Sequence, residues 1–171
     1  LNFNNIDFSL PFGYDYDFCT SEIVEQMTVE DGIIRLPNGV SYNYLVLPDT
    51  KRLTLPLVRK AAALRKEGGK VYLQQPVVGT PGLEGFPESD ERVKALTADW
   101  EILPEGGWNT VFGSDNLLPD FEGEGLMWIH RQAGNSDYYF VANTKPGKTK
   151  KKCIFRTKSE VVELWNPETG Q

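Results

Sequence analysis

Histidine and cysteine are scarce in this 171-residue chain, which has one histidine (His130) and two cysteines (Cys19 and Cys153). A single histidine excludes a histidine-rich metal site and leaves at most one Ser/His or Cys/His pairing. The cysteines have no metal-type spacing, so two free thiols are expected. The G-x-G-x-x-G, P-loop and G-x-S-x-G signatures are all missing. We therefore expect no cofactor and no bound metal.

Long apolar runs and an excess of positive charge are also missing. No stretch is long and apolar enough to span a bilayer, and no basic-then-apolar leader opens the chain, which starts at Leu1 rather than Met. The net charge of −6 argues against nucleic acid or another polyanion as the main partner. With 40% apolar and 25% charged residues, the composition is that of a folded globular protein. We expect neither a membrane nor a nucleic acid as partner.

A β-α-β unit is the clearest pattern that is present. Residues 40–48 ("VSYNYLVLP") alternate and then become continuously apolar, which is typical of a central strand. An amphipathic helix follows, with Thr54 as N-cap, Pro56 in the first turn and a Gly-Gly pair at its end. Residues 70–75 ("KVYLQQ") predict a second strand, which is expected to be parallel to the first because crossovers are right-handed.

The segment before this unit fits the same sheet. Residues 21–32 predict a short helix. A small hairpin follows, from Ile33 through the Asn38-Gly39 turn into the strand at 40–48, because Asn and Gly both tolerate positive φ.

A change in the residue pattern, from α/β-like segments to a turn-rich stretch and then β-like runs, divides the chain into two predicted domains. The Gly/Pro-rich loop at 76–93 follows a strand end, where α/β folds place their sites, and it leads into a helix. Residues 104–125 are turn-rich and acidic, and we read no helical period there. Four β-like runs follow, at 126–132, 137–144, 150–157 and 161–165. We predict an α/β protein with a mostly parallel sheet and helices on both faces over 1–120. A small antiparallel β module over 121–171 is too short to bury a core alone.

The acidic-aromatic stretch "FGYDYDF" is the first candidate site. Its alternating side chains, Tyr14, Asp15, Tyr16 and Asp17, would offer carboxylates and stacking faces to a sugar or an ion. On an extended strand Asp15 and Asp17 would point the same way, roughly 7 Å apart. Binding is favoured over catalysis, and a plain surface turn is the ordinary alternative. No catalytic residue is assigned.

Three further features have a structural and a functional interpretation. Cys19 would be a nucleophile if a helix N-terminus lowered its pKa, but "DFCTS" lacks the glycines of a nucleophile turn, so a packed, unreactive thiol is favoured. The lysine run Lys145–Lys152 contains a Pro-Gly turn, which favours a solvated hairpin tip over a nucleic-acid site. On an alternating strand His130 and Arg131 point to opposite faces. They are expected to fasten the β module to its neighbour rather than perform chemistry.

Several stretches together resemble glycoside hydrolase family 106, the α-L-rhamnosidases, in the region after the catalytic barrel. The resemblance covers nearly the whole chain, in order. It is carried by "GYDYDF", "DGIIRLPNGVSYNYLVLPDT", "GTPGLEGFPESDERV", "DFEGEGLMWIHRQAGNSDYYFVANT" and "ELWNPETG". The first part also resembles the flavodoxin-like or amidotransferase-like domain of some β-galactosidases, which packs between modules or subunits. The second part resembles the opening of a β-sandwich that continues in family members.

The resemblance implies a location outside the active site. In that family hydrolysis is carried out by carboxylates on an (α/β)₈ barrel, assisted by calcium. A chain of 171 residues cannot contain that barrel, and no catalytic residue maps onto it. Members often carry an Asn after the Tyr-Asp stretch, whereas this chain has Thr20.

The implied function is that of a non-catalytic region of an α-L-rhamnosidase-like glycoside hydrolase acting on rhamnose-containing glycans. Its expected partners are the catalytic barrel or other modules of the same enzyme, or a second copy of the chain. The resemblance favours a periplasmic or extracellular location. One alternative is a stand-alone carbohydrate-binding or protein-interaction protein, and another is an amidotransferase-like enzyme that uses Cys19.

Overall fold

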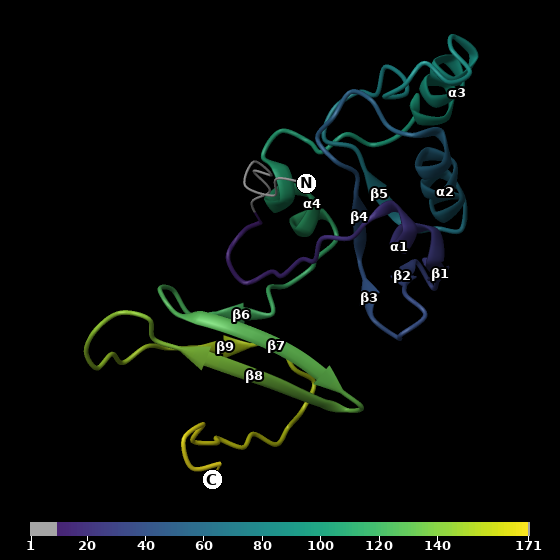
Figure 1. The fold of residues 1–171 in the computed structure, drawn as a ribbon. Coiled ribbons are helices and arrows are strands. Elements are labelled where there is room, and N and C mark those ends of the chain that lie inside the picture. Colours follow the sequence, from purple (N-terminus) through teal and green to yellow (C-terminus); the bar gives the residue numbers. More distant parts are fainter. Residues whose placement is uncertain (1–9, 171) are drawn as a thin grey trace. The chain divides into compact units, whose positions relative to one another are not determined.

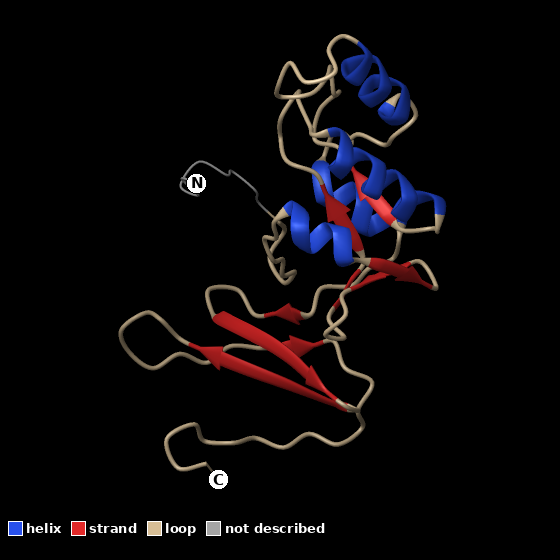
Figure 2. Cartoon of the chain, turned by 45° about the vertical axis from the view of Figure 1, so that its right-hand side comes forward, coloured by secondary structure: helices blue, strands red, loops and turns tan. Residues whose placement is uncertain are grey.

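The computed structural model describes residues 10–170, and their contacts form two compact units (Figure 1). The α/β unit is Asp17–Val111, and the β unit consists of residues 10–16 and 112–170. Two parts were also predicted from the sequence, as 1–120 and 121–171. Contacts place residues 10–16 and 112–120 with the later strands instead. Helices and strands both contribute, so the chain is α/β in class (Figure 2).

The α/β unit begins with a short helix and a three-stranded antiparallel sheet. The prediction that this segment joins the sheet of the β-α-β unit is wrong, because within the described residues its strands pair only with one another. Helix α1 (Ser21–Gln26) is followed by β1 (Thr28–Glu30), β2 (Ile33–Arg35) and β3 (Ser41–Tyr42), in the spatial order β1-β2-β3. The hairpin predicted at Asn38-Gly39 is confirmed, and Gly39 has a φ of +89°. The helix predicted within 21–32 ends earlier, because β1 pairs with β2 from Thr28 onwards.

The predicted β-α-β unit is confirmed, although its first strand is shorter. Strand β4 (Tyr44–Val46) pairs in parallel with β5 (Lys70–Tyr72), and helix α2 (Leu55–Lys66) connects them. The single strand predicted at 40–48 is wrong, because its first half is β3 and pairs with the antiparallel sheet. Thr54 occupies the N-cap position of α2 without a side-chain capping bond.

Both faces of the β4–β5 pair are covered by side chains of the α/β unit. One face packs on the apolar stripe of α2, whose buried members are Val58, Ala61 and Leu64. On the other face Trp108 lies with its ring centroid 5.7 Å from Tyr44 and 5.8 Å from Tyr72. The residues with almost no exposure in this core are Ile34, Leu47, Val58, Leu64, Val71, Leu73 and Val93. Burying each such side chain contributes about 1.5 to 3 kcal/mol.

Two helices follow the parallel pair. The predicted helix after the Gly/Pro-rich loop is confirmed as α3 (Glu88–Thr97), with three acidic residues in its first turn. Helix α4 (Gly107–Ser114) lies where the sequence was read as lacking a helical period, and that reading was wrong. Trp108, Val111 and Phe112 have a helical spacing, and all three are buried. Their burial outweighs the low helix propensity of the glycines in α4.

The β unit contains two pairs of antiparallel strands. Strand β6 (Phe121–Glu122) pairs with β9 (Ile154–Phe155), and β7 (Met127–Ala133) pairs with β8 (Ser136–Ala142). The turn predicted at Gly134-Asn135 is confirmed, since it joins β7 directly to β8. No strand forms at 161–165, in contrast to the prediction, because the described residues offer it no pairing partner.

An aromatic cluster is the core of the β unit. Phe121 is fully buried, with ring centroids 5.8 Å from Trp128 and 5.3 Å from Phe155. Gly13 approaches this cluster closely. It has a φ of +95°, and a Cβ at that position would collide with the backbone of Phe121 and the side chain of Pro119. Within residues 10–170, no helix is long and apolar enough to cross a membrane.

Candidate functional site

The polar groups of the β unit converge on His130. Hairpin register places His130 opposite Tyr139, and the two rings stack with centroids 4.2 Å apart and planes 2° from parallel. The Nε2 atom of His130 is 3.0 Å from Oδ1 of Asp137. Its Nδ1 atom is 3.3 Å from Oδ1 of Asp120. His130 is therefore bonded to two acidic partners of its own unit, and its expected role of fastening the β module to its neighbour stays a prediction.

Each carboxylate beside His130 has a second partner. Asp120 forms an ion pair with Arg156, and Asp137 accepts a hydrogen bond of 2.7 Å from the Thr157 hydroxyl. That hydroxyl and, to a lesser extent, His130 lower the pKa of Asp137, against the opposing effect of burial. Asp137 is therefore ionised at neutral pH and accepts only, so Nε2 of His130 donates.

Tyr139 completes this cluster, which we call the histidine clamp (Asp120, His130, Asp137, Tyr139 and Arg156). Its hydroxyl donates to the backbone carbonyl oxygen of Arg156 at 2.8 Å. Burial, followed by the charges of the two aspartates, raises the pKa of Tyr139 to about 12. It is thus a neutral hydrogen-bond donor at physiological pH. The clamp joins β7 and β8 to the segments around β6 and β9.

The polar side chains of the clamp are already paired with one another, which leaves few groups free to act on a ligand. Asp120, His130 and Asp137 have side chains only 15 to 19% exposed, and each contacts an oppositely charged or hydrogen-bonding group. Among the described residues, no group of three or more His, Cys, Asp or Glu side chains has the arrangement of a metal site. Such a network rigidifies the strands it joins.

A second polar network lies in the α/β unit, on the loop after β5. Thr80 donates its backbone N–H (2.8 Å) and its hydroxyl (2.9 Å) to Oδ1 of Asp90, at the start of α3. Arg52 donates to the carbonyl oxygen of Thr80 at 2.7 Å and lies 3.4 Å from the Asp90 carboxylate. These interactions, the Thr80 backbone N–H first, lower the pKa of Asp90. A side chain at Gly79 would collide with this carboxylate.

The loop held by Asp90 exposes apolar side chains at its tip. Leu83 is 84% exposed and Phe86 is 58% exposed. The sequence predicted a loop at this place, at the carboxyl end of β5, and the structure confirms it. The anchoring of the loop by Asp90 was not predicted, since it depends on a contact between residues ten apart across a turn-rich segment.

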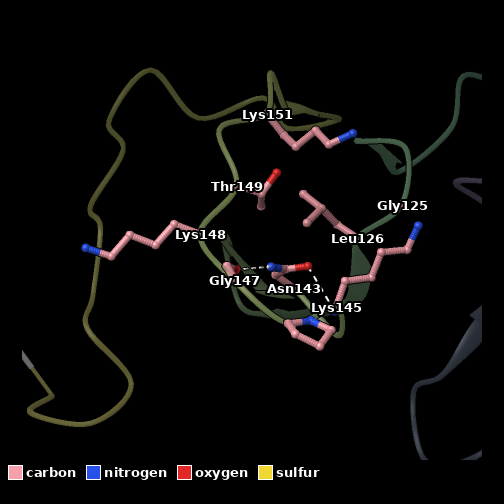
Figure 3. Close-up of a pocket in the computed structure, with 9 residues that line it drawn as sticks. Gly125, Leu126, Asn143, Lys145, Gly147, Lys148, Thr149 and Lys151 are labelled. Carbon is pink, nitrogen blue, oxygen red and sulfur yellow. Dashed lines mark hydrogen bonds between the residues drawn. The ribbon is translucent and has the colours of Figure 1, made fainter.

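A cavity of about 260 Å³ is present in the β unit (Figure 3). It lies between Gly125-Leu126, which precede β7, and the loop from Asn143 to Lys151, which connects β8 to β9. Lys145, Lys148 and Lys151 are among its lining residues. The lysine run was predicted to be a solvated tip between strands, and its residues are indeed exposed.

The four residues of the predicted sugar or ion site are distributed over both units. Tyr14 and Tyr16 belong to the β unit with Asp15, whereas Asp17 belongs to the α/β unit. The Tyr14 hydroxyl donates to the carbonyl oxygen of Leu117 at 2.7 Å, and burial raises the pKa of Tyr14. Asp15 accepts from the backbone N–H of Tyr16 (2.9 Å).

Asp17 also has a partner, because it accepts a hydrogen bond of 2.8 Å from the Tyr42 hydroxyl. Ligand binding by this group of residues stays a prediction. The packed thiol predicted at Cys19 is wrong, because this residue is exposed. Partial burial of its sulfur, followed by the charge of Asp17, nevertheless raises the pKa of its thiol. That shift disfavours the thiolate that a nucleophile requires.

Sequence reasoning found His130 but not its partners. A signal for Asp137 was available, because the Gly134-Asn135 turn fixes a register in which residues 130 and 137 share one face of the hairpin. No comparable signal exists for Asp120 and Arg156. They lie beside β6 and β9, and these two-residue strands pair although Glu122 and its partner Ile154 are 32 positions apart along the chain.

Comparison with known proteins identifies the family. The family model described as alpha-L-rhamnosidase, Glyco_hydro_106, matches residues 3–171. The chain belongs to this glycoside hydrolase family. The resemblance stated from the sequence motifs is therefore confirmed.

Two similar proteins are much longer than this chain. A protein named "Putative beta-glucuronidase", from Formosa agariphila, is 32% identical over 178 residues, which cover 97% of this chain and 15% of that protein. The solved structure of a rhamnosidase from Novosphingobium sp. PP1Y is 24% identical with a TM-score of 0.79, covering 95% of this chain and 17% of its own. The latter match shows a shared fold. The chain spans less than a fifth of either protein.

Proposed function

We propose that this chain is a non-catalytic packing region of an α-L-rhamnosidase-like glycoside hydrolase that acts on rhamnose-containing glycans. Membership of the alpha-L-rhamnosidase family supports the glycosidase assignment. The small share of each relative that the chain covers supports a regional role. The observation that carries the packing role is an apolar face of the β7–β8 hairpin that the rest of the β unit leaves exposed.

This apolar face is defined by Met127 and Ile129 on β7 and by Tyr138 and Phe140 on β8. Their exposed fractions are 60%, 46%, 55% and 54%. Ile129 lies directly opposite Phe140, so the four side chains form one patch. The other face of the hairpin carries Trp128 and the histidine clamp and is packed inside the β unit. Contiguous apolar surface of this kind marks an interaction site.

The energetic value of covering the patch is estimated from its exposure. Full burial of one large apolar side chain contributes about 1.5 to 3 kcal/mol, and each of these four is roughly half exposed. Covering all four is therefore worth roughly 4 kcal/mol. That amount is a large part of the stability of a small domain, commonly about 5 to 15 kcal/mol. We infer that a partner covers this face.

The partner we propose is another module of the same polypeptide. The relatives are more than five times as long as their matched segment, so chain is available in them to supply a cover. A second copy of the chain is the competing occupant. The two make different predictions for the isolated chain, because only self-association depends on its concentration.

For the α/β unit we propose a small flavodoxin-like or amidotransferase-like arrangement that is centred on one parallel strand pair. Its support is the parallel β4–β5 pair with α2 as connection. Isolated parallel bridges also join Arg52 to Gly79 and Leu73 to Ile102. Trp108 covers the face opposite α2.

The substrate class is proposed from the names of the relatives. One relative is a rhamnosidase, and another is named as a glucuronidase. We favour rhamnose-containing glycans because the family description agrees with the solved structure. Aryl α-L-rhamnoside and aryl β-D-glucuronide are the two probes that separate these substrates.

The packing role is tested by hydroxyl-radical footprinting. Met127, Tyr138 and Phe140 have side chains that oxidise readily when solvent reaches them. They are to be labelled in the isolated chain and in the product of the complete reading frame. We expect oxidation of the patch to be several-fold slower in the complete polypeptide. Leu83 and Phe86, at the tip of the α/β unit, serve as an internal comparison.

Equal labelling of the patch in both proteins would refute the packing role. Protection that appears in the isolated chain only as its concentration rises would instead favour a second copy. Replacing Ile129 and Phe140 by Ser should abolish the protection in the complete polypeptide, whereas Lys158→Gln, an exposed residue outside the hairpin, should leave it unchanged.

A further inference from the structure

The lysine-lined cavity of the β unit is formed by residues that belong neither to the apolar patch nor to the histidine clamp. It is bordered by Gly125 and Leu126 on one side and by the β8–β9 loop on the other (Figure 3). In Figure 3 the side chains of Leu126 and Thr149 point into it, Lys145 and Lys151 border it, and Lys148 extends away. Its volume of about 260 Å³ is slightly below the roughly 300 to 1,000 Å³ of pockets for drug-sized ligands, which suits a group of about one sugar ring.

The loop that forms this cavity is held by its own hydrogen bonds. The side-chain oxygen of Asn143 accepts from the backbone N–H of Lys145 at 3.1 Å. The side-chain nitrogen of the same residue donates to the carbonyl oxygen of Gly147 at 3.0 Å. Gly147 has a φ of +96°, which few other residues adopt. The side chain of Asn143 thus closes the turn and holds the backbone at Lys145, the first lysine of the cavity rim.

The charge of this loop is opposite to that of the whole chain. Residues 145–158 contain six lysines and one arginine and no acidic residue, whereas the chain has a net charge of −6. Arg156 is used by Asp120. Within the described residues, Lys145, Lys148 and Lys151 have no carboxylate partner within ion-pair distance. Ammonium groups gathered around a cavity without internal counter-charge attract an anion.

The lining residues also restrict the class of anion. They include no aromatic ring, so they offer no stacking platform for the bases of a nucleic acid. They do provide a hydroxyl (Thr149), amide groups and one apolar side chain (Leu126), next to the ammonium groups. This combination matches a compact, hydroxyl-rich group that carries one negative charge.

We propose that the cavity lined by Leu126, Asn143, Lys145, Thr149 and Lys151 binds an acidic sugar unit of a polysaccharide, through its carboxylate or sulfate group. Lys145 and Lys151 contact the anionic group, and Thr149 donates to or accepts from a ring hydroxyl. The proposal does not depend on the packing role proposed above, since the two use different residues of the β unit. Its function would be to hold a charged glycan chain on the protein.

The proposal is tested by titrating the ¹⁵N-labelled chain with short acidic oligosaccharides and following amide shifts. The probes are oligogalacturonate, a sulfated oligosaccharide, a neutral oligosaccharide of equal length and a duplex DNA oligonucleotide. We expect the amides of Leu126, Asn143 and Thr149 to shift with an acidic saccharide and not with the neutral one. The relative response to the two acidic probes distinguishes carboxylate from sulfate recognition.

Three variants make the test specific. Lys145→Gln and Lys151→Gln should each weaken binding about tenfold, which corresponds to the loss of one charged hydrogen bond. Lys158→Gln removes the same charge outside the cavity and should weaken binding less than about twofold. Lys145→Arg keeps the charge and should retain most of the affinity.

Two results would overturn the proposal. One is the absence of shifts at the cavity with either acidic saccharide. The other is diffuse attraction, seen either as equal weakening by Lys158→Gln and Lys151→Gln or as DNA binding of equal strength at the same residues. All substituted side chains are exposed, so the variants are expected to fold, and their ¹⁵N spectra show whether they do.

Discussion

Replacing His130 by Gln should loosen the β unit. His130 makes one hydrogen bond to the Asp137 carboxylate (3.0 Å), its Nδ1 atom lies 3.3 Å from the Asp120 carboxylate, and its ring stacks on Tyr139. Glutamine can replace one of the two polar contacts but has no ring to stack on Tyr139. The side chains of Asp120, His130 and Asp137 are each less than a fifth exposed, so water replaces a lost partner poorly.

The magnitude follows from these contacts. A hydrogen bond to a charged group contributes about 1.5 to 3 kcal/mol, and a stacked ring pair about 0.5 to 1.5 kcal/mol. Asp120 keeps Arg156 and Asp137 keeps Thr157, which limits the penalty of leaving them without His130. We expect the free energy of opening of the β7–β8 hairpin to fall by about 2 to 4 kcal/mol.

Hydrogen exchange measured by mass spectrometry resolves this change, because it reports β7–β8 separately from the α/β unit. Arg131→Gln is the matched control. Arg131 is the next residue on the same strand, is exposed, and bonds only to the carbonyl oxygen of His130 at 2.7 Å. It should change the opening free energy by less than about 0.5 kcal/mol. A similar, small effect of both substitutions would refute the assigned role of the clamp.

Three further predictions concern single side chains. The folded-state pKa of Asp137 is lowered, so its stabilising effect is complete above the unfolded-state pKa of about 3.9 and is lost as pH falls through the folded-state pKa. Acid should therefore open β7–β8, and Asp137→Asn should make hydrogen exchange there less dependent on pH. An unchanged acid response in the variant would contradict this. Asp90→Ala should speed cleavage by glutamyl endopeptidase at Glu84 several-fold, whereas Glu91→Ala should not, and equal rates would show that Asp90 does not anchor the loop. Because the thiol pKa of Cys19 is raised, iodoacetamide at pH 7 should alkylate Cys19 more slowly than a free thiol in a peptide, and rapid stoichiometric labelling would revive the amidotransferase-like alternative.

Local patterns predicted the α/β unit well where one segment determined its own structure. The helix from Leu55 to Lys66 and the turn at Asn38-Gly39 follow from capping, periodicity and turn chemistry. The strand predicted at 40–48 was divided because its two halves pair with different sheets, and a pattern of apolar residues does not specify pairing partners.

The parts that were missed depend on tertiary contacts. Helix α4 forms although it contains Gly107 and Gly113, because burial of Trp108, Val111 and Phe112 compensates for poor helix propensity. The alternating run at 161–165 forms no strand, because alternation alone supplies no neighbour to bond with. Two of the five residues of the histidine clamp could not be predicted either, since Asp120 and Arg156 meet only when β6 pairs with β9.

The predicted acidic-aromatic site shows the same limit from the other side. The sequence identifies Tyr14 as aromatic and Asp17 as acidic, but it does not specify what either side chain contacts. In the structure Tyr14 donates to Leu117, and Asp17 accepts from Tyr42. These contacts between distant segments decide the environment of each side chain.

Turnover of an aryl α-L-rhamnoside by the purified chain of residues 1–171 tests the central claim most directly, with aryl β-D-glucuronide as the second substrate. A packing region has no acid–base carboxylate pair across a scissile bond, so release of the aryl group should equal that of buffer alone. The product of the complete reading frame should hydrolyse one of the two glycosides. Turnover by the purified chain that disappears in Asp15→Asn or Asp17→Asn would contradict the account.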